Sequence, residues 1–390
     1  MDFELWYLIA VPVLFAAGWF SRGLESKQQF EHDQPPECYT RGVSLLLGDE
    51  PDRAVESFTE AVRLDPDTTE LQHVLGKLYR RRGDFERAVR LHQHLFNRED
   101  LAMEERVEAL RELALDYFTA GLYDRAEAAY RQLSETPSFY LEAMKKLLEI
   151  YVIEHEWQLA VDTALSIEQR AGEDRSVEIA HYNCELAEGA LQAKNFGLAK
   201  EYVERALERD EATPRVDITA GRVATALGER DEALRHWRRV TQRHPEYLPL
   251  VLGGIADALD AGGEREEALS LLRRALEENH TVDVLEQALT RLASWENPAS
   301  AEGAAKAMLS QHPSLSAFNA ILQLQAKAEP EDEKIKLLSQ LMARHARRFA
   351  RYRCSHCGFL ASSFSWRCLG CGSWDSFPPR RVEDAKGKSR

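Results

Sequence analysis

Four of the six cysteines in this 390-residue chain lie close together near its C-terminus. They form two Cys-x2-Cys pairs separated by ten residues: Cys354, Cys357, Cys368 and Cys371. Thiolates at this spacing can converge on one metal ion as a tetrahedral site. A glycine follows each pair and suits the tight turn that aims backbone N–H groups at sulfur. Because protein fills all four positions, the sequence predicts a structural metal site that leaves no position for substrate or water.

The residues around these cysteines predict a small module that depends on its metal. Tyr352 and Trp366 each precede a cysteine pair by two residues, and further aromatic residues supply a small core: Phe359, Phe364, Trp374 and Phe377. A module of about 30 residues cannot fold by apolar burial alone, whereas a structural metal contributes about 10 to 16 kcal/mol of binding free energy. Spacing alone does not separate zinc from iron, because both accept four thiolates.

Charge is unevenly distributed along the chain. Residues 344–390 contain eleven Lys/Arg and three Asp/Glu, whereas the whole chain has a formal charge of −15, so residues 1–343 carry −23. An acidic body argues against nucleic acid as the main ligand, and a nucleic-acid-binding ribbon is the weaker interpretation of the basic end. We expect the cysteine module to dock onto the acidic body through its flanking arginines: Arg344, Arg347, Arg348, Arg351, Arg353, Arg380 and Arg381.

The N-terminus predicts a retained membrane anchor. Leu5 to Ser21 are seventeen residues without a charge, and as a helix they would span roughly 25 Å. Aromatic residues stand at both ends, the start is acidic and no small-residue cleavage site follows. A cleaved signal and a buried soluble helix are the weaker alternatives. Arg22 and Lys27 follow the span, so we expect the rest of the chain in the cytoplasm, where reduced thiols favour metal over disulfide.

The middle of the chain is a repeat with spacings of 34 to 39 residues. An alanine recurs at that spacing, at Ala54, Ala88, Ala126, Ala160, Ala199, Ala233 and Ala268. Four glycines lie five residues before their alanine, where a turn between two helices needs a permissive backbone: Gly83, Gly121, Gly228 and Gly263. Each unit is therefore predicted to be a helical hairpin. Because one hairpin cannot bury its apolar face, the hairpins are predicted to stack as a solenoid.

This pattern resembles the tetratricopeptide repeat, most clearly in GDEPDRAVESFTEAVRLDP and AGLYDRAEAAYRQL. An eighth repeat is expected around Ala301 and Met308, and a final helix pair between Leu315 and Ala350. Extra residues fall in NREDLAMEER and RAGEDRS, where they should lengthen connections between hairpins. The predicted fold class is all-α: a tetratricopeptide-repeat solenoid with an N-terminal transmembrane helix and a small C-terminal metal-binding domain.

Outside the cysteine pairs, the sequence contains no convincing catalytic constellation, so we predict that the chain is not an enzyme. His155 and Glu156 begin a sequence like H-E-x-x-H, but Leu159 stands where the second histidine would be. Cys38 and Cys184 fall on helices inside repeats and are expected to be buried thiols. His92 and His94 lie on different faces of a helix and are expected to be surface or packing residues.

The whole chain resembles the lipopolysaccharide assembly protein B family of bacterial inner-membrane proteins. The matching stretches are PVLFAAGWF, AGLYDRAE, VEIAHYNCELA, RYRCSHCGF and WRCLGCGSW, and the order of anchor, repeats and cysteine pairs matches too. The resemblance implies a rubredoxin-type knuckle in which Cys354, Cys357, Cys368 and Cys371 bind iron, with zinc as the alternative. It also implies an adaptor that regulates lipopolysaccharide synthesis by promoting degradation of the deacetylase LpxC by the membrane protease FtsH.

These features predict the domains as follows: anchor 1–21, linker 22–34, solenoid 35–345, metal knuckle 346–380 and charged tail 381–390. The expected partners are FtsH and LpxC, or other lipopolysaccharide-synthesis proteins, at the bacterial inner membrane, with a homodimer left open and no nucleic acid. A rubredoxin-like electron carrier is the alternative from another functional class, although it would have little use for seven or more repeats. A general repeat scaffold for assembly is the other alternative.

Overall fold

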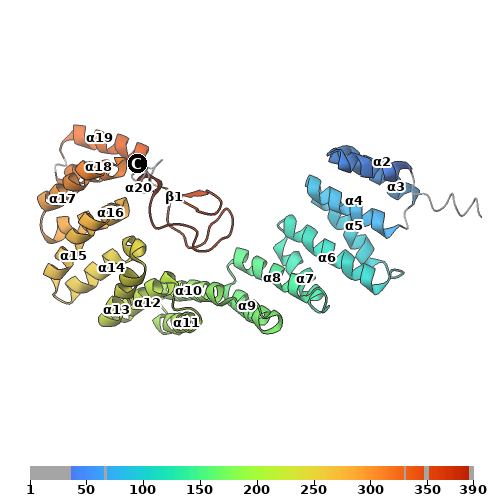
Figure 1. Ribbon diagram of the computed structural model, residues 1–390, viewed down its shortest axis with the longest axis horizontal. Helices are drawn as coiled ribbons and strands as arrows, with labels where there is room; N and C mark the ends of the chain where they lie inside the picture. Colours follow the sequence, from blue (N-terminus) through green and yellow to red (C-terminus); the bar gives the residue numbers. More distant parts are fainter. Residues whose placement is uncertain (1–36, 66–67, 329–330, 347–350, 386–390) are drawn as a thin grey trace, which may run out of the picture. The chain divides into compact units, whose positions relative to one another are not determined.

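The computed structural model describes residues 37–65, 68–328, 331–346 and 351–385. The chain divides into two compact units, Met1–Ile150 and Tyr151–Arg390. The first unit contains the helices α2 (Glu37–Leu47), α3 (Pro51–Leu64), α4 (Thr69–Arg82), α5 (Phe85–Asn97), α6 (Met103–Thr119), α7 (Tyr123–Ser134) and most of α8 (Tyr140–Glu154) (Figure 1). The predicted anchor and linker, residues 1–34, lie outside the described residues.

The second unit contains a longer series of helices and the C-terminal module. The helices are α9 (Trp157–Ala171), α10 (Ser176–Gln192), α11 (Phe196–Arg209), α12 (Pro214–Leu227), α13 (Arg230–Arg243), the 3-10 turn η1 (Pro245–Tyr247), α14 (Leu248–Ala261), α15 (Arg265–Glu278), α16 (Val282–Trp295), α17 (Pro298–Gln311), α18 (Leu315–Ala328) and α19 (Glu333–Ala346). The strands β1 (Tyr352–Arg353) and β2 (Leu360–Ala361) and the short helix α20 (Val382–Ala385) follow.

Consecutive helices pack as hairpins, which confirms the predicted all-α repeat architecture. The packed pairs are α2–α3, α4–α5 and α6–α7 in the first unit and α10–α11, α12–α13, α14–α15, α16–α17 and α18–α19 in the second, and the last two confirm the eighth repeat and the final pair. In the second unit each even-numbered helix from α10 to α16 also contacts the next even-numbered helix, so these helices form one continuous row. The expectation that extra residues lengthen two connections is wrong for 172–175, which is no longer than 65–68 or 210–213, and 98–102 is only one residue longer. Most of the extra residues extend the helices that follow, since α6 and α10 have 17 residues each where α12 and α14 have 14.

The turn inside each of the first seven hairpins uses the same backbone conformation, whereas Glu296 in the eighth has φ of −108°. Gly83, Gly121, Gly228 and Gly263 all have positive φ, between 73° and 83°, as their spacing predicted. The three of these seven repeats without glycine there place another residue in the same left-handed conformation: Asp49, His155 and Lys194. His155 is therefore a turn residue of the repeat, and the turn accounts for its position beside Glu156.

Within a hairpin, the small residue of the first helix makes room for a large side chain of the second. A Cβ added at Gly42 would overlap the ring of Phe58, at Gly76 the ring of His92, and at Gly221 the indole of Trp237. In each case the two residues are sixteen positions apart. Phe58, His92 and Trp237 are all buried, so glycine lets the two backbones approach while the ring fills the space between them.

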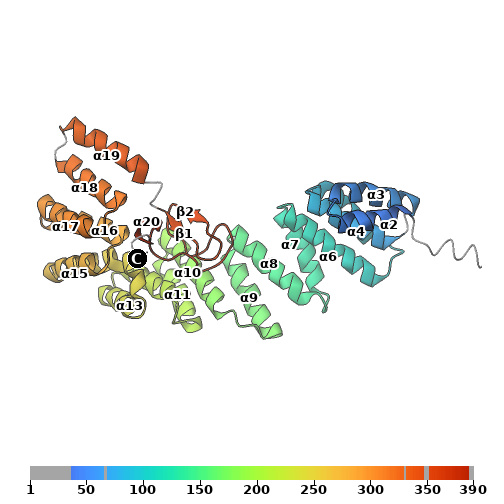
Figure 2. The ribbon, with the colours of Figure 1, turned by 45° about the horizontal axis from the view of Figure 1, so that its top comes forward.

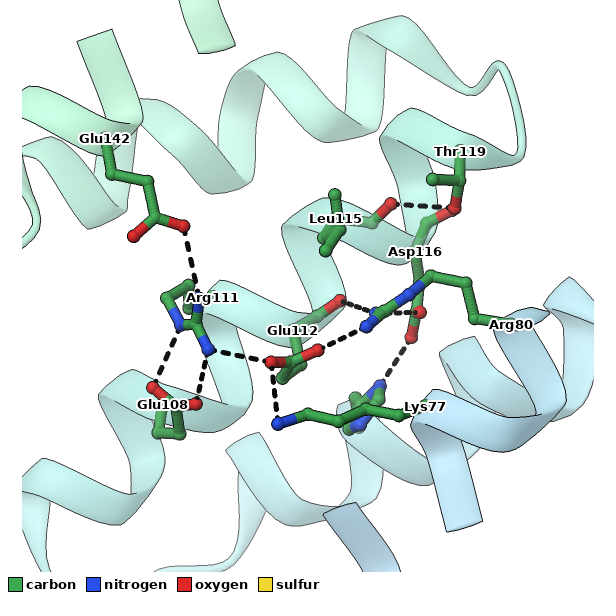
Figure 3. Close-up of polar contacts among 10 residues, drawn as sticks. Lys77, Arg80, Glu108, Arg111, Glu112, Leu115, Asp116, Thr119 and Glu142 are labelled. Carbon is green, nitrogen blue, oxygen red and sulfur yellow. Dashed lines mark hydrogen bonds and ion pairs between the residues drawn. The ribbon is translucent and has the colours of Figure 1, made fainter. Parts of the chain in front are cut away.

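Ion pairs join neighbouring hairpins of the first unit around two buried acidic residues of α6, Glu112 and Asp116 (Figure 3). Arg80 of α4 donates to Glu112 at 2.6 Å and to Asp116 at 2.7 Å, and Asp116 lies 2.5 Å from Nδ1 of the buried His92. Arg111 pairs with Glu108 and Glu112 on its own helix. Because each charge here has a partner, the cluster is a structural link between α4, α5 and α6.

Candidate metal centre and its docking surface

The C-terminal knuckle consists of two turns of matching geometry. In the first, Cys354 N–H donates to the Phe359 carbonyl at 2.9 Å and Gly358 N–H donates to the Cys354 carbonyl at 3.0 Å. In the second, Cys368 N–H donates to the Ser373 carbonyl at 2.9 Å and Gly372 N–H to the Cys368 carbonyl at 2.8 Å. Both glycines have positive φ, which explains why glycine follows each cysteine pair. The antiparallel pairing of β1 with β2 closes the first turn.

These turns bring the four predicted ligands together. All four sulfur atoms lie within 4.8 Å of one another, with Cys354 and Cys371 3.8 Å apart and Cys357 and Cys368 3.7 Å apart. Four sulfurs at about 2.3 Å from a central ion would lie roughly 3.8 Å from one another in a regular tetrahedron. Backbone N–H groups of Cys357 and Gly370 point at the sulfurs of Cys354 and Cys368, at 3.5 and 3.3 Å. The donor set therefore fits a single tetrahedral metal ion.

The protonation of the thiols also favours a cation at the centre. Burial opposes ionisation of Cys354, but hydrogen bonds from Ser376 and from backbone N–H groups outweigh it and lower its pKa to about 6. Hydrogen bonds with Ser373 lower the pKa of Cys371. A backbone hydrogen bond at Phe359 favours the Cys357 thiolate, yet burial and the neighbouring sulfurs raise its pKa to about 12. Sulfurs this close ionise together only when a positive charge lies among them.

The knuckle docks on the even-numbered helices of the second unit through two tryptophans. Figure 2 shows the knuckle beside α10, and His181 of α10 stacks on Trp374 of the knuckle. Arg215 of α12 lies against both indoles, 5.7 Å from the ring centre of Trp366 and 5.3 Å from that of Trp374. Only 3% of Arg215 is exposed, and its guanidinium also donates to Glu185 at 2.7 Å. A buried cation held between aromatic faces and a carboxylate makes a specific contact.

Further contacts extend this interface on both sides of Arg215. The ring of His181 stacks on Trp374 at 4.5 Å, and its Nε2 lies 2.9 Å from Oδ2 of Asp375. Tyr247 stacks on Trp366 at 5.5 Å. The hydroxyl of Tyr352 donates to Asp283 of α16 at 2.8 Å. The interface therefore runs along α10, α12, η1 and α16.

The expected docking by arginines is only partly correct. Arg381 pairs with Asp283 and Glu286, both at 2.7 Å. Arg351, Arg353 and Arg380 are exposed, and Arg347 and Arg348 lie outside the described residues. The main cation of the interface is instead Arg215, which the acidic body supplies to the knuckle. Exposed arginines gain little from ion pairing in water, whereas a cation between two rings is largely desolvated.

The short helix α20 supplies the N-terminal caps of two solenoid helices. Asp384 accepts from the backbone N–H of Val282, at the start of α16, at 3.3 Å. Glu383 accepts from the Ser314 hydroxyl at 3.0 Å and from the N–H of Ser316 at 3.4 Å, at the start of α18. Carboxylates are favoured at helix N-termini because unpaired N–H groups point outward there. Residues of the segment expected to be a charged tail thus contact the solenoid.

Comparison with known proteins identifies the family of the chain. Residues 352–379 match the family described as the rubredoxin metal binding domain, and residues 70–100 and 218–283 match tetratricopeptide repeats. Lipopolysaccharide assembly protein B of Escherichia coli strain K12 is 32% identical over 386 residues, covering 98% of this chain and 99% of that protein. The chain belongs to the lipopolysaccharide assembly protein B family.

Two further similarities were found. The Haemophilus influenzae lipopolysaccharide assembly protein B is 26% identical over 96% of this chain and 98% of its own length. A solved tetratricopeptide repeat protein from Parabacteroides merdae is 17% identical over 79% of this chain and 98% of its own, with a TM-score of 0.27. The two lipopolysaccharide assembly proteins and the matched families confirm the resemblance seen in the sequence, together with its repeats and its metal-binding knuckle.

The remaining cysteines and the histidine pair named in the sequence analysis lie outside the metal site. Cys38 and Cys184 are buried, with 3% and 0% exposed, and burial raises the pKa of Cys184 to about 11. His92 is buried and His94 exposed. Within the described residues, no helix is both long and apolar enough to cross a membrane.

Sequence reasoning missed the solenoid side of this interface, which includes Arg215, His181 and Tyr247. His181 lies in VEIAHYNCELA, one of the stretches on which the family resemblance rests, so that stretch was the available signal. Nothing in the repeat period marks Arg215, because its role depends on two tryptophans about 150 residues away.

Proposed function

We propose that the chain is a membrane-anchored cytoplasmic adaptor that regulates lipopolysaccharide synthesis by promoting degradation of the deacetylase LpxC by the protease FtsH. The observation that carries this proposal is the match over 98% of the chain to proteins named for lipopolysaccharide assembly. A repeat solenoid suits an adaptor because its stacked hairpins offer an extended surface to a partner.

The anchor is part of the proposal, with residues 1–21 in the inner membrane and the bulk of the chain in the cytoplasm. Confinement to the same membrane as a protease raises effective concentration, and such linkage can strengthen binding by about 10² to 10⁴. An electron carrier would gain little from this confinement, so the anchor distinguishes the two classes of function.

A cellular experiment tests the adaptor directly. In cells lacking the native protein, we expect a form without residues 1–21 to fail to restore normal deacetylase turnover. Fusing an unrelated membrane span at Arg22 should restore it at least partly. Full restoration by the soluble form at native expression levels would contradict an anchored adaptor.

For the metal, we propose one iron ion held by Cys354, Cys357, Cys368 and Cys371, with zinc as the alternative. The sulfur geometry supports four thiolate ligands but suits either ion. Elemental analysis and visible absorption of the purified protein distinguish them, since the iron protein is coloured and the zinc protein colourless. Reversible reduction coupled to a redox partner, without any effect on deacetylase turnover, would favour the electron carrier instead.

A further inference from the structure

The second unit contains an open groove that the proposed function does not yet use. Its volume is about 460 Å³, and it runs along α10 beside the start of α9 and part of α11. The walls are half-buried apolar or aromatic side chains: Trp157, Leu186, Leu198 and Tyr202. The volume falls within the range of about 300 to 1,000 Å³ that is typical of ligand sites.

Gly189 gives this groove an open floor. It lies within α10, and a Cβ built there would meet no heavy atom within 4 Å. Glycine in the middle of a helix costs about 1 kcal/mol relative to alanine. Glycine also permits the close approach of another backbone. The groove is therefore accessible along the helix itself and suits a chain segment better than a compact molecule.

The groove lies in an acidic part of the chain, and the two carboxylates that line it are each paired with one arginine. The charged side chains that line it are Glu185 and Glu188. Their arginine partners, Arg215 and Arg222, come from α12 and lie outside the groove lining. The surrounding residues 151–209 contain twelve Asp/Glu and six Lys/Arg. Tyr202 already carries the guanidinium of Arg205 over its ring, at 5.4 Å. Positive charge on an occupant would complement these carboxylates.

The groove is also braced by the metal knuckle. Trp157 stacks on Tyr182 at 6.0 Å and meets the edge of Trp374 at 6.3 Å. One aromatic wall of the groove thus rests on the side chain that docks the knuckle onto α10. A wall held in place in this way reduces the ordering that an occupant would otherwise have to impose.

We infer that this groove is a docking site for a basic amphipathic helix of a partner protein. Apolar side chains spaced three or four residues apart would enter between Trp157, Leu198 and Tyr202. Flanking Lys or Arg side chains would meet Glu185 and Glu188. The inference rests on the proposed adaptor function, and it specifies the chemistry by which the adaptor holds one partner.

The test measures binding of a defined probe to the full-length, metal-loaded protein in detergent. The probe is a fluorescein-labelled helical peptide with leucines on one face and lysines on the other, and its counterpart carries glutamate for every lysine. We expect the basic peptide to bind at least about tenfold more tightly than the acidic one. Absence of binding to the wild-type protein would overturn the inference.

A pair of variants separates the groove from general charge attraction. Gly189→Leu places a side chain in the groove, with its Cβ at a point where no heavy atom lies within 4 Å, and is expected to weaken peptide binding at least about tenfold. Gly303→Leu, at an exposed position of α17 where a Cβ also meets nothing, is the control and should leave binding unchanged. Both changes replace a helix glycine by a better helix former, so both variants should fold. Equal binding by the two variants would overturn the assignment to the groove.

This assay does not depend on the cellular proposal. Groove-dependent peptide binding without any effect on deacetylase turnover would keep the docking site and contradict the adaptor function. Restored turnover in cells that carry Gly189→Leu, together with unchanged peptide binding, would contradict the docking site alone.

Discussion

The hairpins and the knuckle are held together over very different sequence distances. In the solenoid, polar contacts between neighbouring hairpins join residues about one repeat apart, as in Arg80–Glu112 and Arg291–Asp257, 32 and 34 positions apart. The knuckle contacts the solenoid across 98 positions in Arg381–Asp283 and 194 in His181–Asp375. Stability in the solenoid is therefore distributed over many local contacts, whereas the knuckle depends on four sulfur atoms and one interface.

The largest expected effect is the loss of the metal. Cys354→Ser or Cys371→Ser should remove about one ion per chain, because the knuckle has too small an apolar core to fold without it. Residues 351–385 should become sensitive to protease while the helices remain folded. Elemental analysis and limited proteolysis measure the two effects. Cys38→Ala, outside the cluster, is the control and should keep its metal; a protected knuckle without metal would contradict the comparison.

The next largest effect concerns the packing inside a hairpin. Gly221→Ala should reduce stability by about 1 to 3 kcal/mol, because the new methyl group overlaps the indole of Trp237. Gly303→Ala, in an open helical position, should instead increase stability by up to about 1 kcal/mol. Urea unfolding followed by circular dichroism measures both. Equal effects of the two changes would mean that close helix approach is unimportant in the repeat.

The period of the sequence predicted these hairpins, because each contact recurs every 34 to 39 residues. The turns at the four glycines and the metal-binding cysteine pairs were equally predictable, because each depends only on residues close together in the sequence. The sequence also contained a size complementarity between the two helices of a hairpin that was not recognised. A small residue in the first helix has a large one sixteen positions later, as in Gly221 and Trp237, and a large residue has a small one, as in Leu148 and Ala164. The docking surface could not be predicted from the sequence, because no regular spacing relates Arg215 to Trp366 and Trp374.

A smaller effect is expected at the turns. Gly228→Ala should cost about 1 kcal/mol, since φ is 78° there and a Cβ disfavours this conformation. Lys194 occupies the equivalent turn position with φ of 58°, so Lys194→Gly should be neutral or stabilising by up to about 1 kcal/mol. Thermal unfolding of the two variants compares them directly. Destabilisation by Lys194→Gly would show that its side chain, which is exposed, contributes to the fold.

The most local effect is a pH dependence of the α20 contact. Burial, only partly offset by backbone hydrogen bonds from Arg381 and Val282, raises the pKa of Asp384 from 3.8 to about 6. Because the folded state binds this proton more tightly, the contribution of Asp384 to stability falls as pH rises from about 4 to about 6. Asp384→Asn should remove that slope. Exchange of the Val282 amide between pH 4 and pH 7 measures it, and an identical slope in the variant would contradict the assignment.

The central claim is that a metal ion holds the knuckle in the form that docks on α10, α12 and α16. Hydrogen–deuterium exchange of the metal-loaded and metal-stripped protein tests it most directly. The account predicts that stripping removes protection from residues 351–385 and lowers it at the docking surface around His181, Arg215 and Asp283, while α4 to α7 keep theirs. Unchanged protection of residues 351–385 after complete removal of the metal would contradict it.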